Sequence, residues 1–245
     1  MHPAADHAGE MTLALSSGAT AQRHRSRRIW AVIQHVEYDG EGAIGHALRR
    51  AEYPWVSVRP FLGDPVPRVA DLSGLIVLGA PDGSADDRGC AHLVAERRLI
   101  ADAVGLGLPV LGVCFGAQLL AVSLGGSVIR DGVPEVGMGA AVLTAAGRED
   151  RVLGSAAPDL TVLHWHRHSY TLPRGAVRLA TSSSGTEQAF RVNDKVYGLQ
   201  FHVEIHAELA RVIADRMPGG ALAPDAVARA SAWGDAVLDR FLAKH

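Results

Sequence analysis

The clearest chemical feature of the sequence is Cys114, which stands between Gly112 and Gly116. Residues 109–113 form a short apolar run typical of a buried strand, and helical spacing resumes at residues 114–120, so Cys114 is predicted to lie at a sharp strand-to-helix turn. Glycines relieve crowding at such a turn, and the helix N-terminus favours a thiolate. This placement indicates a nucleophile that attacks a carbonyl. The alternative is a buried, inert cysteine that only fills space.

A second feature, His202 and Glu204, follows the strand-like residues 195–200. Alternate residues of an extended segment lie on the same side, so the imidazole and the carboxylate are expected to meet. The carboxylate can then bond one ring nitrogen while the other faces a thiol, an arrangement that suits a general base with its orienting group. On its own a His-x-Glu pair is a weak signal, but together with the turn at Cys114 it becomes specific.

With both features in place, the chain resembles the class I glutamine amidotransferases, whose catalytic triad is Cys, His and Glu in that order. The resemblance runs from about residue 28 to residue 210. Residues 112–118 match the family's G-x-C-x-G-x-Q motif, and residues 202–204 match its H-P-E motif. Residues 165–166 and 197–202 are similar to the stand-alone, GMP-synthase-like subgroup. The two motifs in the correct order make this a strong signal.

The resemblance implies an enzyme in which Cys114 attacks the side-chain amide of glutamine. His202 would act first as base and then as acid, and Glu204 would orient it. Ammonia would leave from a γ-glutamyl thioester, which water would then cleave to release glutamate. The resemblance implies a partly backbone-built site around this triad. Its oxyanion hole would use the N–H groups of Phe115 and Ala80.

The family pattern also implies substrate-binding residues. Gln118 matches the family's glutamine-contacting residue, and the backbone of Arg167 and His168 matches the segment that holds the substrate's α-amino and carboxylate groups. Three positions depart from the family: Ala80 replaces a glycine, Val203 replaces the proline of H-P-E, and His168 stands where close relatives usually have aspartate. An alanine forced to a positive φ costs on the order of 1 kcal/mol, which could hold the oxyanion loop in an inactive geometry.

The histidines also allow a metal-site interpretation, because alternate residues share one face of a strand. The two sets are His164, His166 and His168, and His202, Glu204 and His206. His166 and His202 are already part of the family pattern, however, and the cysteine chemistry needs no metal. We therefore expect neither a metal nor a cofactor. Cys90 is expected to cap or fill the start of its helix rather than to take part in catalysis.

The elements that position these residues alternate between strand and helix. Apolar runs at residues 29–33, 55–58, 75–78 and 109–113 predict buried strands, and helical spacing lies between them, most clearly at residues 91–104. This alternation indicates a parallel sheet covered on both faces. Later short runs, at residues 161–168, 177–181, 187–192 and 195–200, predict a mixed extension of the sheet, and residues 224–242 predict a final helix. The expected fold is a three-layer α/β sandwich with a mostly parallel central sheet, flavodoxin-like as in the resembled family.

Composition narrows the class of protein further. The 245 residues are 48% hydrophobic with a net charge of −2, which excludes disorder for the chain as a whole. No apolar run approaches the ~20 residues of a membrane-spanning helix. The near balance of 24 basic and 26 acidic residues gives no case for nucleic-acid binding. Two cysteines suit a reducing cytoplasm. We expect residues 1–28 to form a disordered extension and residues 29–245 to form one glutamine amidotransferase domain.

Three functions remain open at this stage. The first is a glutaminase that supplies ammonia to a separate synthetase or acceptor subunit, because no part of the chain is left for an acceptor-activating domain. The second is a hydrolase of other γ-glutamyl amides or peptides that uses the same triad. The third is a catalytically weak regulatory homologue, an idea motivated by Ala80 and His168. The intact triad argues against the third.

Overall fold

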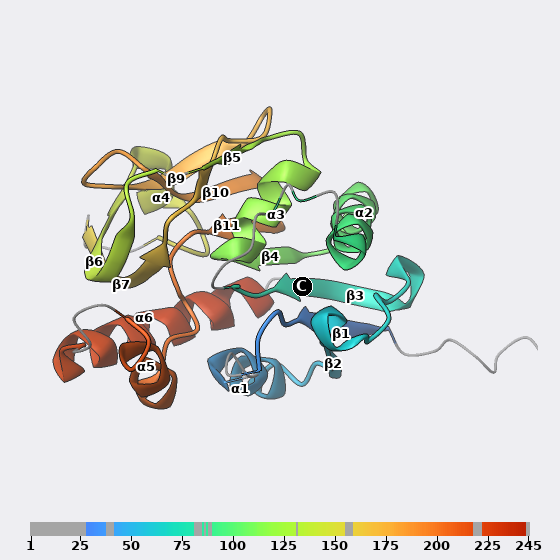
Figure 1. The fold of residues 1–245 in the computed structure, drawn as a ribbon, viewed down its shortest axis with the longest axis horizontal. Coiled ribbons are helices and arrows are strands. Elements are labelled where there is room, and N and C mark those ends of the chain that lie inside the picture. The colour runs from blue at the N-terminus through green and yellow to red at the C-terminus, as the bar shows by residue number, and fades with distance from the viewer. Residues whose placement is uncertain are drawn as a thin grey trace, which may run out of the picture.

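The computed structural model describes most of the chain after its N-terminal segment. The described residues are 28–37, 42–80, 85, 87, 90–130, 132–154, 159–217 and 222–243. Of the expected extension 1–28, only Arg28 is among them. Pro81, at the end of the predicted oxyanion loop, also lies outside the described residues. The described part folds around one large sheet with helices on both faces (Figure 1).

The first half of the nine-stranded sheet is parallel. Its strands follow the order β2-β1-β3-β4-β11, and each pairs in parallel with its neighbour. Such strands are buried on both faces, which explains their continuous apolar sequences. Their bounds are β1 (Ile29–Ile33), β2 (Trp55–Val58), β3 (Leu72–Val77), β4 (Val110–Val113) and β11 (Val196–Leu199).

The second half of the sheet is antiparallel and continues from β11 in the order β10-β9-β6-β7. This confirms the predicted mixed extension. Two short strands, β5 (Val128–Ile129) and β8 (Ser169–Tyr170), form a separate antiparallel pair. The larger strands are β6 (Glu135–Leu143), β7 (Asp159–His166), β9 (Val177–Ser182) and β10 (Glu187–Asn193).

Helices cover the two faces of the sheet and complete three layers (Figure 1). Helices α1 (Gly42–Arg50) and α6 (Pro224–Leu242) share one buried apolar cluster with the sheet. Helices α2 (Ala91–Gly105) and α3 (Phe115–Ser123) share the other. The three-layer α/β fold is therefore confirmed. The remaining short helices are α4 (Ala145–Glu149), α5 (Ala207–Ala214) and the 3₁₀ turns Pro60–Leu62 and Val69–Asp71.

One strand boundary differs clearly from the sequence prediction. Strand β3 begins at Leu72 rather than at residue 75, and its first residues include Ser73 and Gly74, which are not apolar. Gly74 is needed there because a Cβ would lie 2.6 Å from the ring of Trp30 on β1. Packing between neighbouring strands thus extends β3 beyond its apolar run. In the described part of the chain, no helix is both long and apolar enough to cross a bilayer.

Candidate active site

Cys114 lies at the predicted turn between β4 and α3. It takes φ +52° and ψ −110°, a backbone conformation that is rare for residues other than glycine. Both neighbouring glycines are required by close backbone approach. A Cβ on Gly112 would lie 2.5 Å from the Gly116 carbonyl oxygen, and one on Gly116 would lie 2.0 Å from the Val77 carbonyl oxygen. The strained turn holds Cys114, which is 3% exposed, at the N-terminus of α3.

Strand pairing brings the second motif to the same edge of the sheet. Strand β11 runs parallel to β4 with Leu199 opposite Val113, and the N–H of Cys114 donates to the Leu199 carbonyl at 2.7 Å. The chain then continues to His202, whose N–H donates to the Leu163 carbonyl of β7 at 2.9 Å. Although β7 forms the edge of the sheet, it therefore also meets the segment after β11.

His202 and Glu204 form a buried pair, as the spacing predicts. The Nδ1–H of His202 donates to Oε1 of Glu204 at 2.7 Å, and the two residues are 6% and 2% exposed. The other ring nitrogen, Nε2, has no hydrogen-bond partner among the residues that the structure describes. Burial lowers the pKa of His202, but the charges of Glu204 and of a Cys114 thiolate offset this and raise the pKa well above its ordinary value. His202 can therefore hold a proton beside the sulfur.

The sulfur of Cys114 has two further polar neighbours. Its S–H donates to the Trp165 carbonyl at 3.6 Å, and the Nε2 of Gln200 lies 3.9 Å from the sulfur. Gln200 is fully buried, and its Oε1 accepts from Gln118 Nε2 at 3.3 Å. Sequence reasoning missed Gln200, although a glutamine that interrupts an apolar strand just before His202 is a usable signal. A buried amide needs partners, and here these partners link β11 to α3.

The predicted substrate-binding residues lie partly together. The Nε2 of Gln118 also donates to the His168 carbonyl at 3.1 Å, so α3 contacts the segment after β7. Arg167 is exposed and His168 is half-buried. Val203, which replaces the family's proline, is buried against α6, where a Cβ on Gly234 would lie 2.0 Å from its carbonyl oxygen.

The two predicted donors of the oxyanion hole lie on neighbouring parts of the fold. Phe115 is the first residue of α3, and Ala80 is half-buried three residues after the end of β3. Among the described residues other than glycine, only Glu52 and Cys114 have a positive φ. Ala80 therefore keeps an ordinary backbone conformation in this structure. Whether its N–H serves the oxyanion stays a prediction.

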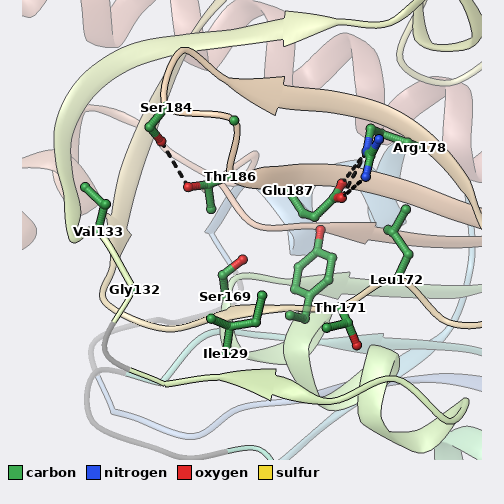
Figure 2. A pocket seen from close by; sticks show the side chains of 12 residues that line it. Ile129, Gly132, Val133, Ser169, Thr171, Leu172, Arg178, Ser184, Thr186 and Glu187 are labelled. Atoms are coloured by element: carbon green, nitrogen blue, oxygen red, sulfur yellow. Dashed lines mark hydrogen bonds and ion pairs between the residues drawn. The ribbon is translucent and has the colours of Figure 1, made fainter.

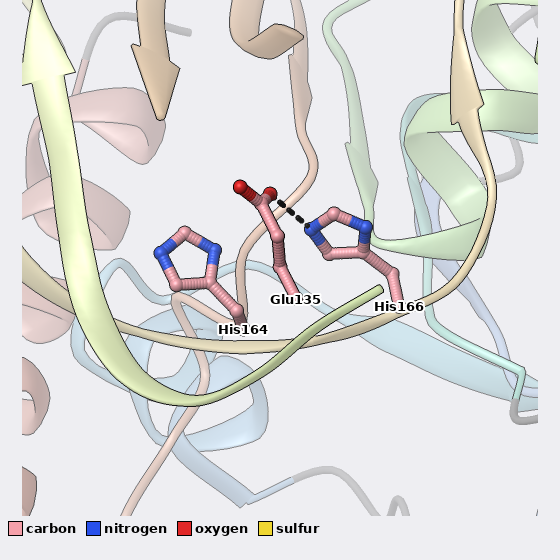
Figure 3. Close-up of side chains that lie close together, drawn as sticks. All are labelled: Glu135, His164 and His166. Atoms are coloured by element: carbon pink, nitrogen blue, oxygen red, sulfur yellow. Dashed lines mark ion pairs between the residues drawn. The ribbon is translucent and has the colours of Figure 1, made fainter. Parts of the chain in front are cut away.

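The histidines do not gather as the metal interpretation grouped them. His206 accepts from the Leu209 N–H at 3.4 Å and caps α5. His164 and His166 instead meet Glu135 of β6 (Figure 3). Cys90 occupies the N-cap position of α2 without a side-chain capping bond, so it fills the start of the helix as expected.

A surface pocket lies beside β8, directly after the segment of Arg167 and His168 (Figure 2). The ion pair of Arg178 and Glu187 borders it, and its lining also includes Tyr170. None of the three predicted triad residues is part of this lining. The pocket is therefore distinct from the place where an amide would meet Cys114.

Comparison with known proteins matches both the sequence and the fold. The family described as glutamine amidotransferase class-I matches residues 43–213. A glutamine amidotransferase-like protein of Salmonella typhimurium is 31% identical over 180 residues, which cover 72% of this chain and 75% of that protein. A glutamine-hydrolyzing subunit of GMP synthase from Natronomonas pharaonis is 34% identical over 180 residues, which cover 71% and 89%. A glutamine amidotransferase structure from Methylobacillus flagellatus superposes with a TM-score of 0.79 at 27% identity, covering 88% of this chain and 94% of that one.

Proposed function

Because the chain belongs to the class I glutamine amidotransferase family, we propose that it hydrolyses the side-chain amide of glutamine with Cys114 as nucleophile. One observation carries this proposal. The Nδ1–H of His202 is held by Glu204 at 2.7 Å, which leaves the buried, unpartnered Nε2 to serve the thiol of Cys114. A thiol, an imidazole and an orienting carboxylate in this order are the parts of a covalent amide hydrolase.

The reaction proceeds in two halves. The Cys114 thiolate attacks the amide carbon, and the bond to nitrogen breaks as His202 Nε2–H gives its proton to the leaving amine. Ammonia departs and a γ-glutamyl thioester remains on the sulfur. Neutral His202 then removes a proton from water, which attacks the thioester and releases glutamate with the thiolate restored. Glu204 keeps the imidazole in the correct tautomer and stabilises its charged form throughout.

Backbone groups complete the proposed site. The N–H of Phe115, at the N-terminus of α3, and that of Ala80 would stabilise the oxyanion of each tetrahedral intermediate. Gln118 and the backbone of Arg167 and His168 would hold the amino-acid end of the substrate. The bond from Gln118 to the His168 carbonyl supports this, because it ties that segment to the helix that carries the nucleophile.

We further propose that the ammonia passes to a separate acceptor protein. One of the relatives is named as a single subunit of a GMP synthase, and the alignment covers 89% of that subunit. A separate partner is therefore the arrangement that this similarity favours. Both cysteines are free, and a thiol nucleophile must stay reduced, so we place the protein in the cytoplasm.

The proposal is tested by following glutamate release from glutamine and from a panel of γ-glutamyl amines, with Cys114→Ala as the inactive control. We expect glutamine to be hydrolysed and the variant to be silent. Turnover of γ-glutamyl amines with none of glutamine would instead identify a γ-glutamyl hydrolase. If no substrate is hydrolysed and an electrophilic glutamine analogue fails to label Cys114, the protein is a catalytically weak homologue and the proposal is wrong.

A further inference from the structure

Three potential metal ligands meet beside the proposed triad, on the antiparallel part of the sheet (Figure 3). The register of β6 and β7 pairs Glu135 with His166 and Gly137 with His164. The three side chains therefore project from one face of two neighbouring strands. One ligand atom from each of Glu135, His164 and His166 lies within 4.8 Å of the other two. The sequence alone does not reveal this group, because it depends on the pairing of two distant strands.

The imidazoles of this cluster lack ordinary partners. His164 and His166 are 5% and 7% exposed. The Nδ1 of His164 and both ring nitrogens of His166 are buried and have no hydrogen-bond partner within the described part of the chain. The Nε2 of His166 does lie 3.2 Å from Glu135 Oε2, but without the alignment of a hydrogen bond. Buried polar atoms without partners cost about 1–3 kcal/mol each, so a missing ligand is a physical explanation for them.

The carboxylate of Glu135 is held in place by neighbouring strands. Ser184 Oγ–H donates to its Oε1 at 2.9 Å, and Gln188 Nε2–H donates to its Oε2 at 2.6 Å. Hydrogen bonds of this kind orient ligating carboxylates in metal sites. Burial raises the pKa of Glu135, but the contact with His166 and the nearby hydroxyls lower it to about 2. Burial lowers the pKa of His164, which leaves its imidazole neutral. Both groups thus have the ionisation state that metal binding requires.

We propose that Glu135, His164 and His166 bind a divalent transition-metal ion of the zinc type. Two imidazoles and one carboxylate are a ligand set that zinc accepts, with a water completing the coordination. Bonds of about 2.0–2.2 Å would require the side chains to close slightly around the ion. Gly139 makes room for this movement, since a Cβ there would lie 2.7 Å from His164 Cδ2. The site is independent of the proposed glutaminase chemistry, which needs no metal.

Metal binding can be measured directly on the full-length chain. Zn²⁺ is titrated by calorimetry, and Co²⁺ is titrated by the visible absorption of its d–d transitions, which reports coordination geometry. Both are done in a Cys114→Ser background, because a free thiolate also binds these ions. We expect one saturable site for each ion. Glu135→Gln and His164→Asn should each weaken binding at least about tenfold, since even the loss of an outer-shell partner costs that much.

His46→Ala is the matched control, because His46 is an exposed histidine on α1. It should leave the affinity for both ions unchanged. Thermal melting without metal shows whether each variant is folded, and a rise in melting temperature with Zn²⁺ should be lost in Glu135→Gln and His164→Asn but kept in His46→Ala. Absence of saturable binding in the Cys114→Ser protein overturns the proposal. Binding of equal strength in the folded Glu135→Gln and His164→Asn variants also overturns it.

Discussion

The Nε2 of His35 lies 2.8 Å from Oε2 of Glu96, and both side chains are buried. The other ring nitrogen, Nδ1, lies 3.2 Å from the Leu78 carbonyl oxygen. Because a carbonyl oxygen can only accept, Nδ1 carries the hydrogen. The imidazole also packs edge-on against Phe115, with ring centroids 5.0 Å apart. His35 therefore contacts both segments that carry the proposed oxyanion-hole donors, the one leading to residue 80 and the start of α3.

From this contact we expect His35 to position the oxyanion hole. His35→Ala should lower kcat up to about a hundredfold, because small displacements of catalytic groups have effects of that size. KM should change little, since the oxyanion forms only during the reaction. The matched control is His92→Ala, because His92 contacts the same Glu96 from one turn earlier in α2. Equal losses of kcat in both variants would show that the effect belongs to the Glu96 cluster as a whole.

Cys114 should be the only residue modified by an electrophilic glutamine analogue, because it alone lies at the strand-to-helix turn. Peptide mapping by mass spectrometry identifies the labelled residue. Cys90→Ser should keep full glutaminase activity, whereas Cys114→Ser should lose it. Label on Cys90, or activity that survives in Cys114→Ser, would show that the nucleophile is assigned wrongly.

The pair of His202 and Glu204 should make stability depend on pH. The pKa of His202 is raised in the folded protein above its ordinary value of 6.5. A proton held more tightly in the folded state stabilises the protein fully below about pH 6.5, and this contribution is lost as the pH rises through the folded pKa. Glu204→Gln removes one of the charges that raise this pKa. The free energy of unfolding should therefore fall less, between about pH 6 and about pH 9, in this variant than in the wild type.

Chemical denaturation at several pH values measures this difference. Glu208→Gln is the control, because Glu208 is an exposed carboxylate on α5 and should reproduce the wild-type profile. The same variants can be assayed for glutamate release. His202→Ala should lose several orders of magnitude in kcat, and Glu204→Gln should lose less because it mainly fixes a tautomer. Identical pH profiles for Glu204→Gln and the wild type would argue against a raised pKa.

Local signals predicted the turn at Cys114, whereas strand pairing decided what the sequence could not reveal. Gly112 and Gly116 lie near the cysteine in the chain, so their spacing alone indicates a tight turn. Strand β6 was not predicted, because Gly137, Gly139 and two alanines break the apolar alternation that marks a strand. Without β6, the meeting of Glu135 with the histidines of β7 had no basis. His35 and Glu96 were missed for the same reason, since they lie on different elements.

The glycine at position 116 should be required for the turn. A Cβ there would lie 2.0 Å from the Val77 carbonyl oxygen, which is backbone and cannot rotate away. Gly116→Ala should lower the free energy of unfolding by at least about 1–3 kcal/mol, as overpacking does, and should displace Cys114. Gly105→Ala is the control, because nothing lies within 4 Å of a Cβ at this helical position. The control should be neutral or slightly stabilising in urea denaturation.

Ala80 stands where the family has glycine, and its N–H is the proposed second donor to the oxyanion. It is not among the described residues with a positive φ, so the structure shows no strain at this position. If catalysis requires the N–H to turn inward at a positive φ, the Cβ opposes that turn by on the order of 1 kcal/mol. The protein without a partner would then be a slow glutaminase, because a misdirected donor costs about 3 kcal/mol in the transition state.

Ala80→Gly should relieve this barrier and raise kcat on glutamine, in the absence of any partner, by roughly fivefold for 1 kcal/mol. Steady-state glutamate release measures the change. Ala176→Gly serves as the control, because Ala176 lies in a half-buried turn before β9 and reports what an added glycine does to the chain in general. The control should leave kcat unaltered. If Ala80→Gly also leaves kcat unaltered or lowers it, the ordinary backbone of Ala80 is already competent, and any dependence of the activity on a partner must arise elsewhere in the site.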